Sequence, residues 1–159
     1  MNEKQGLDRR QFMGLSWAAA LVAFAVQTGG ALVKYLTPEL EAGAFGTKVR
    51  AGELNEFEVG SVSFFREGRF FLIRLEEGFL ALYRKCPHLG CAVPWDEDAS
   101  NFNCPCHTSL FDEKGEVLSG PSPRPLDYFP VEIREGIVFV DTGRLMTRQA
   151  FDTTQVTPV

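Results

Sequence analysis

The stretches that decide the fold are CPHLGC, residues 86–91, and CPCHTS, residues 104–109. Together they hold all four cysteines and both histidines of the 159-residue chain. Each begins with Cys-Pro and carries one histidine, as Cys86-x-His88 and as Cys104-x2-His107. Thiolates and imidazoles are the side chains that bind soft and borderline metal ions. The repeated pattern therefore indicates one metal site that is assembled from two loops.

Three chemistries could use these six residues. Four cysteines in an exported domain can form two disulfides, but that arrangement leaves both histidines unexplained. A Cys2His2 zinc site uses both residue types, yet zinc fingers place two cysteines before two histidines, whereas here each loop supplies one of each. An iron–sulfur cluster with two thiolate and two imidazole ligands would use four of the six. The cluster explains the repeated pattern best.

The constellation C-x-H-x-G-C with C-x-C-H-x-S resembles the Rieske family of iron–sulfur proteins. Val93-Pro94-Trp95 extends the likeness, and residues 120–126, GPSPRPL, resemble the proline-rich loop that covers the cluster in that family. With the N-terminal anchor described below, the chain is similar to the Rieske subunit of the cytochrome bc-type quinol:cytochrome c oxidoreductases. The resemblance implies an all-β fold of three packed antiparallel sheets. It also implies that the cluster-binding part, about residues 85–126, is inserted between two strands of the base.

The resemblance further implies a role for each of the six residues. Two thiolates would bind one iron of a [2Fe–2S] cluster and two imidazoles the other, these ligands being Cys86, Cys104, His88 and His107. The remaining cysteines, Cys91 and Cys106, would form a disulfide that ties the two loops together. In the family an imidazole at the exposed tip accepts a hydrogen bond from quinol. His107 is the preferred contact and proton acceptor here, with His88 as the alternative.

Residues next to the ligands are expected to tune the cluster; they are Leu89, Ser109, Phe111 and Pro121. Ser109 takes the place of the family serine that donates to a bridging sulfide. Quinone-linked members often have Tyr where this chain has Phe111, and Gly is common at the position of Thr108. Donors to sulfur stabilise the reduced, more negative state. We therefore predict a redox potential below that of members with Tyr, a property that would suit menaquinol.

An uncharged run precedes the β-rich part of the chain. Its 23 residues, 11–33, would form a helix of roughly 35 Å, enough to cross a hydrocarbon core of about 30 Å. The apolar region of a cleaved signal peptide is usually shorter, so we expect residues 1–36 to contain a retained, single-pass anchor.

Basic residues set the expected orientation of this anchor. Three lie before the uncharged run and one directly after it, namely Lys4, Arg9, Arg10 and Lys34. The positive-inside rule then predicts a cytoplasmic N-terminus and a Rieske domain on the periplasmic, extracytoplasmic side of a bacterial cell membrane. Arg9-Arg10-Gln11-Phe12 also resembles the twin-arginine export signal, which implies that the domain folds and acquires its cofactor before export.

The rest of the chain divides by composition. Residues 37–47 contain Pro38, Gly43 and Gly46 and are expected to be a flexible linker or hinge. Residues 48–142 show short apolar runs separated by turn residues, which predicts antiparallel hairpins. The expected strands are residues 61–65, 69–75, 79–84, 109–111, 117–118, 131–134 and 137–140. Residues 143–159 show no pattern, and we assign this C-terminal tail no role.

The expected function is electron transfer from membrane quinol, with coupled proton release, to a c-type cytochrome. A cytochrome b-type membrane subunit would be the partner. The formal net charge of −5 argues against nucleic acid, whose binding needs a concentrated basic surface. The alternative is the Rieske subunit of another exported oxidoreductase such as arsenite oxidase, some of which share the Ser-x-Phe pattern of residues 109–111. Soluble Rieske ferredoxins and ring-hydroxylating oxygenases fit poorly, because they lack the extra cysteine pair and the anchor.

Overall fold

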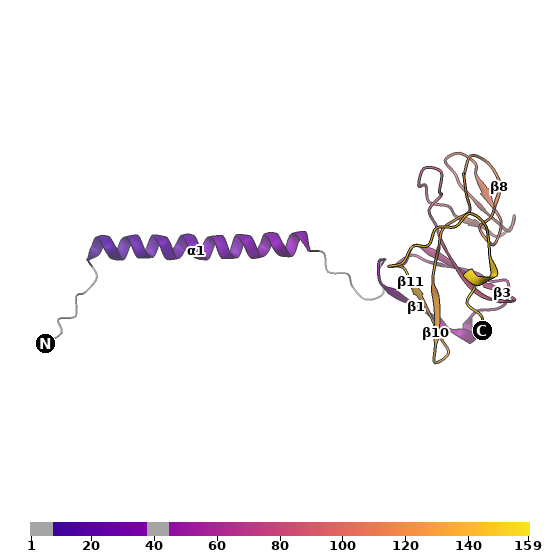
Figure 1. The fold of residues 1–159 in the computed structure, drawn as a ribbon, viewed down its shortest axis with the longest axis horizontal. Coiled ribbons are helices and arrows are strands. Elements are labelled where there is room, and N and C mark those ends of the chain that lie inside the picture. The colour runs from indigo at the N-terminus through magenta and orange to yellow at the C-terminus, as the bar shows by residue number, and fades with distance from the viewer. Residues whose placement is uncertain (1–7, 38–44) are drawn as a thin grey trace. The chain divides into compact units, whose positions relative to one another are not determined.

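The computed structural model describes residues 8–37 and 45–159. The chain divides into two compact units, Met1–Glu39 and Leu40–Val159. The described part of the first unit is a single helix, α1 (Arg9–Leu36), and that of the second contains all the strands and two 3-10 helices, η1 (Leu54–Glu56) and η2 (Thr153–Gln155) (Figure 1). The expected fold class, antiparallel sheets preceded by one apolar helix, is confirmed.

Helix α1 has the length and composition of a membrane span. Its 28 residues correspond to about 42 Å of helix, and all of them are exposed to the surroundings. The helix begins two residues before the uncharged run, because the Gln11 side chain accepts a hydrogen bond from the Asp8 backbone N–H at 3.2 Å and caps the first turn. Among the described residues it is the one helix long and apolar enough to cross a membrane. Residues 1–7 of the expected anchor lie outside the described residues.

The expected linker, residues 37–47, is only partly described, since residues 38–44 lie outside the described ranges. Its last three residues belong to the folded unit. The Gly46 N–H donates to Thr142 Oγ1 at 2.8 Å, and the Phe45 ring stacks on Tyr83 with centroids 5.7 Å apart. The packed part of the second unit therefore includes Phe45, three residues before the expected start.

Three antiparallel sheets form the second unit. The first has the order β1 (Lys48–Glu53), β11 (Ile137–Asp141), β10 (Val131–Arg134). The second has the order β2 (Val62–Phe65), β3 (Phe70–Leu75), β4 (Gly78–Tyr83), β9 (Tyr128–Phe129). The third has the order β5 (Trp95–Asp96), β6 (Asn101–Asn103), β7 (Leu110–Phe111), β8 (Val117–Ser119). Each expected hairpin is present within one or two residues of its expected bounds.

The second sheet lies between two cores because both of its faces are buried. Successive side chains of a strand point to opposite faces. In β3, Phe70 and Leu72 therefore pack with residues of the first sheet, whereas Phe71 and Ile73 pack with residues of the third. This arrangement explains why β3 and β4 read as nearly continuous apolar runs rather than as alternating patterns.

The third sheet is an insertion between β4 and β9. These two strands pair directly, with Ala81 opposite Phe129 and Leu82 opposite Tyr128, although residues 84–127 separate them in the sequence. The chain leaves the second sheet at β4, forms the third sheet and its loops, and returns to the neighbouring position. Within this unit β8 lies at one end, far from β10 at the other (Figure 1). The insertion implied by the family resemblance is therefore present.

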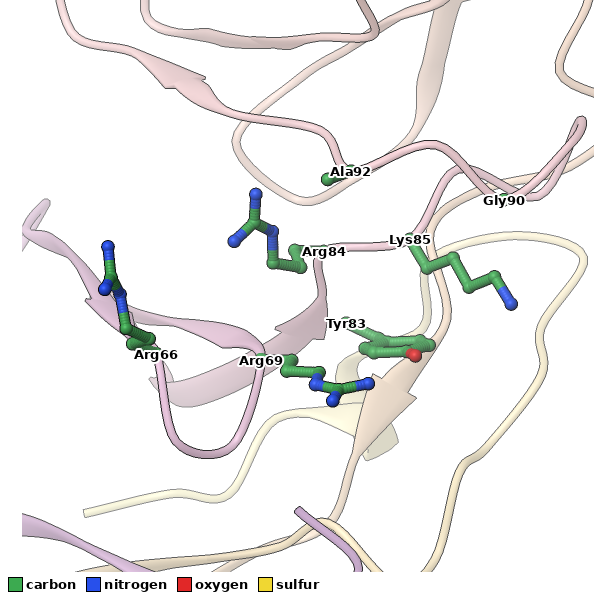
Figure 2. Close-up of a pocket in the computed structure, with 7 residues that line it drawn as sticks. All are labelled: Arg66, Arg69, Tyr83, Arg84, Lys85, Gly90 and Ala92. Carbon is green, nitrogen blue, oxygen red and sulfur yellow. The ribbon is translucent and has the colours of Figure 1, made fainter. Parts of the chain in front are cut away.

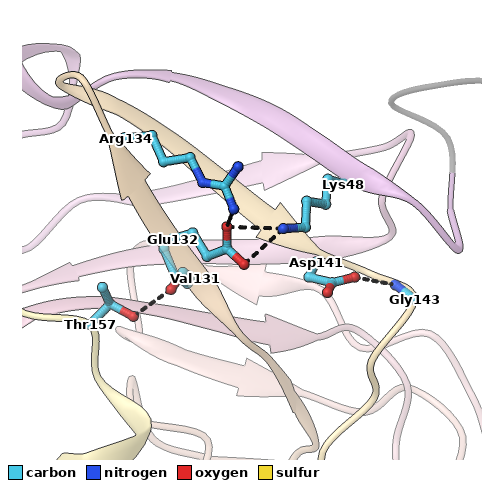
Figure 3. Close-up of polar contacts among 7 residues, drawn as sticks. All are labelled: Lys48, Val131, Glu132, Arg134, Asp141, Gly143 and Thr157. Carbon is cyan, nitrogen blue, oxygen red and sulfur yellow. Dashed lines mark hydrogen bonds and ion pairs between the residues drawn. The ribbon is translucent and has the colours of Figure 1, made fainter.

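Residues 143–159, to which the sequence analysis assigned no role, are packed against the sheets. Backbone bridges join Met146 to Tyr128 and Thr157 to Phe79. The Thr157 hydroxyl donates to Val131 O at 2.8 Å (Figure 3), and Val156 is buried in the core that faces the third sheet. The same view shows an exposed ion pair across the first sheet, Lys48 with Glu132 at 2.8 Å, of a kind that contributes little to stability. The C-terminal segment is part of the domain.

Arg148 connects this segment to the insertion. Its side chain is buried and donates to Leu126 O at 2.8 Å, to Gln155 Oε1 at 2.6 Å and to Lys114 O. Burial lowers the pKa of the Arg148 guanidinium. Nearby acidic side chains raise it, and Glu116 has the largest effect among them. A buried guanidinium that satisfies carbonyls from two segments is costly to remove, because each carbonyl would lose its donor.

Replacing Arg148 with Met should lower the free energy of unfolding by about 3 kcal/mol, since buried acceptors are left unpaired. Denaturant unfolding of the full chain in detergent, followed by tryptophan fluorescence, measures the change. Arg144→Met is the matched control at an exposed position and should shift stability by less than about 0.5 kcal/mol. Equal effects of the two substitutions would contradict a structural role for the C-terminal segment.

Candidate metal centre

The two cysteine-bearing loops have the same backbone hydrogen bonds. The first, residues 86–91, follows β4, and the second, residues 104–109, connects β6 to β7. In each loop the backbone N–H of the first cysteine donates to the carbonyl of the residue five positions later. The carbonyl of the same cysteine accepts from the N–H of the residue four positions later. The bonds are Cys86 N to Cys91 O at 2.8 Å, Gly90 N to Cys86 O at 2.9 Å, Cys104 N to Ser109 O at 2.9 Å and Thr108 N to Cys104 O at 3.0 Å. The loops are therefore two copies of one turn.

The equivalent position of each turn has a positive φ. It is Gly90 in the first loop, with φ 81°, and Thr108 in the second, with φ 56°. Glycine adopts this left-handed region freely, whereas a β-branched residue is strained there by roughly 1–2 kcal/mol. The Thr108 hydroxyl donates to His107 O at 2.8 Å. The departure from the usual Gly thus introduces strain beside a predicted ligand.

A disulfide joins the two loops. Cys91 and Cys106 are bonded, with their Cα atoms 6.6 Å apart, so the expected pairing is confirmed. The sulfur of Cys104 lies within 4.8 Å of both disulfide sulfurs. That group of three sulfurs is not a ligand set, because disulfide sulfurs are not thiolates. Among the described cysteines, Cys86 and Cys104 are the free thiols.

Both free thiols lie inside the protein. Cys86 is 2% exposed and Cys104 is 1% exposed, in the core that also contains Phe111. Burial raises the pKa of the Cys86 thiol, and the neighbouring Cys104 adds to this effect. Hydrogen bonds from the His88 backbone and the Ser109 side chain lower that pKa. The two thiols therefore interact with each other and with donors that would stabilise a thiolate.

Both histidines lie nearer the protein surface than the two buried thiols. Their ring centroids are 4.8 Å apart with the planes nearly perpendicular, His88 being half-buried and His107 exposed. The structure thus brings together all four residues predicted to be ligands, with sulfur donors inside and nitrogen donors outside. Two thiolates and two imidazoles in this arrangement are the donor set of a [2Fe–2S] cluster of the Rieske type.

The proline-rich loop rests on the second cysteine loop. A Cβ at Gly120, where φ is 97°, would lie only 2.5 Å from the Ser109 Cα, so glycine is required for this close approach. The Ser122 N–H donates to Ser109 Oγ at 3.2 Å, and Ser109 is fully buried. Pro121 between them is exposed. The Ser122 N–H therefore helps to fix the buried Ser109 hydroxyl, which interacts with the Cys86 thiol.

Of the other residues expected to tune the site, Phe111 is buried and Leu89 is exposed. Phe111 is fully buried in β7, opposite Phe102 of β6. Leu89 is 69% exposed and lines a cavity of about 410 Å³ together with Cys86 and His88. Leu145, 45% exposed, lines the same cavity from the C-terminal segment. Sequence reasoning missed Leu145; the one signal was an apolar pair, Leu145-Met146, in a polar segment.

An ion pair next to the site was also missed. Arg124 donates to both carboxylate oxygens of Asp127, one of them at 3.1 Å, and this pairing raises the pKa of Arg124. Asp127 is buried, and its backbone carbonyl accepts from Tyr83 N at 2.8 Å. The ion pair joins two residues at the end of the proline-rich stretch, and the backbone bond from Tyr83 attaches that end to β4. Charged residues within an otherwise apolar, proline-rich stretch were the only sequence signal.

Replacing Thr108 with Gly should raise the free energy of unfolding by about 1 kcal/mol, because the left-handed strain is removed. The matched control is Thr108→Ala, which keeps a Cβ at the same positive φ and should bring a smaller gain. Denaturant midpoints of the three proteins, measured under the same conditions, give the comparison. A loss of stability in the glycine variant would show that the hydroxyl outweighs the strain.

Comparisons with known proteins agree with this geometry. The Rieske [2Fe-2S] domain family matches residues 45–130, which contain both cysteine loops and the proline-rich loop. The cytochrome b6-f complex iron-sulfur subunit of Parasynechococcus marenigrum is 33% identical over 151 residues, which are 85% of this chain and 85% of that protein. The subunit of the same name from Chlorobaculum tepidum is 28% identical over 135 residues, 84% of this chain and 75% of its own.

A solved structure extends the likeness to three dimensions. A chain of a hyperthermophilic respiratory Complex III has 26% sequence identity and a TM-score of 0.51, covering 79% of this chain and 97% of its own. The matched family holds a [2Fe–2S] cluster, and the two buried thiols and two outer imidazoles suit that cofactor. The chain therefore belongs to the Rieske [2Fe–2S] family, as a membrane-anchored iron–sulfur subunit of the cytochrome b6-f/bc type.

Proposed function

We propose that four residues hold the cluster, two thiolates on one iron and two imidazoles on the other, namely Cys86, Cys104, His88 and His107. The observation that carries this assignment is the separation of donors, with both free thiols buried and both imidazoles toward solvent. The disulfide supports it, because Cys91 and Cys106 are no longer available as thiolates. The matching turns place the two free thiols at corresponding positions, with His88 two residues after Cys86 and His107 three residues after Cys104.

The bound cluster would supply a one-electron site that changes from neutral to singly negative on reduction, at potentials of roughly −150 to +300 mV for this ligand type. The role of the protein would be to place the imidazoles where the added negative charge would raise their affinity for protons. Electron and proton uptake are then coupled. Oxidation of a quinol requires this coupling, since both particles must leave the substrate.

His107 is proposed to accept the hydrogen bond and the proton of quinol at its ring nitrogen that does not bind iron. Its ring is the more exposed of the two, with His88 as the second candidate. Two exposed apolar side chains, Leu89 and Leu145, line a cavity with His88 but not with His107, so this cavity supports the second candidate. An apolar rim around a polar acceptor suits a quinol ring and an apolar surface of a membrane subunit.

The proposed pathway takes the electron from membrane quinol, with menaquinol as the candidate, to a c-type cytochrome. A cytochrome b-type subunit would provide the quinol site. Support comes from the relatives, which are named as subunits of the cytochrome b6-f complex, and from the likeness to a chain of Complex III. The proposal keeps the bacterial cell membrane as location and the predicted orientation, with a cytoplasmic N-terminus.

One sequence observation favours a second candidate, the Rieske subunit of an exported oxidoreductase such as arsenite oxidase. Ser109 is followed two residues later by Phe111, a pattern that some of those subunits share. The names of the relatives favour the cytochrome complex. A molybdopterin subunit as the natural partner would indicate the second candidate, whereas a b-type haem subunit would indicate the first.

The midpoint potential of the cluster should fall as pH rises, because deprotonated imidazoles no longer stabilise the reduced, more negative state. For one proton coupled to one electron, the slope is about 59 mV per pH unit. Redox titrations of the purified holoprotein at several pH values, followed by the EPR signal of the reduced form, measure it. A midpoint that is independent of pH up to strongly alkaline conditions would argue against imidazole ligands.

The substitution Phe111→Tyr should raise the midpoint potential, if the new hydroxyl donates to a ligand thiolate as the family pattern implies. One additional hydrogen bond of about 1 kcal/mol corresponds to roughly 40 mV for a one-electron couple. Ser109→Ala removes a donor to Cys86 and should shift the potential the other way. An unchanged or lower midpoint in Phe111→Tyr would refute the explanation of a low potential by the missing hydroxyl.

A further inference from the structure

A pocket lined by basic side chains lies beside the first cysteine loop. It has a volume of about 430 Å³, and we call it the cationic pocket; its lining residues are Arg66, Arg69, Tyr83, Arg84, Lys85, Gly90 and Ala92. Figure 2 shows Arg66 and Arg84 on one side of the opening, with Arg69 and Lys85 next to the Tyr83 ring on the other. No acidic residue is among these seven, although the chain as a whole has a net charge of −5.

Backbone hydrogen bonds bring three segments together at this pocket. Arg84 N donates to Arg69 O at 3.2 Å, which joins the end of β4 to the turn between β2 and β3. Arg84 O accepts from Val93 N at 2.8 Å, which joins it to the chain that leaves the first cysteine loop. Within the turn, Arg69 N donates to Arg66 O at 3.3 Å. Arg66 and Arg69 are close in sequence, and so are Arg84 and Lys85. The fold brings these two pairs of cations together at one pocket.

Among the described residues, no acidic side chain forms an ion pair with the cations of the cationic pocket. Within residues 8–37 and 45–159, the ion pairs are Lys48–Glu132, Arg124–Asp127 and Arg134–Glu132, and none involves a pocket residue. Glu67 lies between Arg66 and Arg69 in the sequence but forms no ion pair with either. Like charges around one cavity repel one another, and an anion in the cavity would replace that repulsion with attraction.

Arg84 carries a donor without a partner. Its Nε is buried and has no hydrogen-bond acceptor among the described residues. Its guanidinium lies over the Phe64 ring, 4.8 Å from the centroid, and that of Arg69 lies over the Phe45 ring at 5.0 Å. Stacking on a ring does not use the N–H groups that lie in the plane of the guanidinium. A buried donor without an acceptor is unfavourable, so an anion whose oxygen reached the Arg84 guanidinium would stabilise the folded protein.

We propose that the cationic pocket binds a phosphate group. Guanidinium groups donate two parallel hydrogen bonds to such an oxyanion, and Lys85 and the Tyr83 hydroxyl can add further donors. The volume exceeds what a bare ion needs, because a water molecule takes up about 30 Å³, so an ester substituent also fits. Two sources offer this chemistry to a membrane-anchored protein, namely free inorganic phosphate and the headgroup of an anionic phospholipid.

Occupation of the cationic pocket would act on the redox centre. Gly90 and Ala92 flank Cys91, and a Cβ at Gly90 would lie 2.6 Å from Lys85 Cε, so the Lys85 stem lies directly on the first cysteine loop. A bound anion adds negative charge beside this loop and opposes reduction, which lowers the midpoint potential. By linkage, the reduced protein binds phosphate more weakly than the oxidised protein by the same factor.

The test uses the full-length holoprotein in neutral detergent. Isothermal titration is carried out with sodium phosphate, with sodium chloride at equal ionic strength as reference. The second arm uses dihexanoyl-phosphatidylglycerol, with the zwitterionic dihexanoyl-phosphatidylcholine as reference. We expect saturable binding of at least one phosphate probe and a lower midpoint potential at saturation. Binding in both arms or in the first alone assigns free phosphate as a ligand, and binding in the second alone assigns the lipid headgroup.

Substitutions locate the binding site. Arg84→Gln and Arg66→Gln should each weaken binding about tenfold or more, as loss of a charge-assisted hydrogen bond implies. Arg66 is exposed, so its variant tests the proposal even if Arg84→Gln fails to fold. Arg50→Gln, an exposed residue outside the pocket with the same change in charge, is the control and should alter affinity less than twofold. The proposal is overturned if neither probe binds saturably, or if Arg50→Gln weakens binding as much as Arg66→Gln.

Discussion

The pairing of β4 with β9 is the constraint on which the rest of the domain depends. Because these strands are neighbours in the second sheet, the chain between them must leave and return at one place. The inserted segment can then carry a third sheet whose loops are not required for the continuity of the base. The second sheet is buried on both faces, so apolar packing holds the base and the insertion to the same two strands, β3 and β4.

Burial divides the redox centre into two halves with different chemistry. Thiols in the core between the second and third sheets have little access to water, which would keep the proposed sulfur ligands away from oxidants and solvent. Imidazoles on the outer side can exchange protons with a substrate. The disulfide joins the two cysteine loops and the proline-rich loop contacts the second of them, and this support suits the proposed coupling of electron and proton transfer.

The surroundings of the centre come from distant parts of the chain. Leu145 reaches the cavity from a segment that Arg148 connects to the insertion, and the cationic pocket combines a turn after β2 with residues after β4. Both features change the environment of the first cysteine loop, one by apolar surface and one by positive charge. The potential of the centre and the partners it accepts therefore depend on more than the ligands and their immediate neighbours.

The sequence by itself determined the nature of the centre, the class of the fold and the presence of a span. Cysteine and histidine chemistry and the alternation of apolar residues are local properties, so they can be recognised without coordinates. Only the tertiary structure decided that residues 143–159 belong to the domain, that Thr108 adopts a left-handed conformation, and that four cations share one pocket. Each of these depends on backbone pairing or close approach between segments far apart in the chain, for which no local pattern of residues provides a signal.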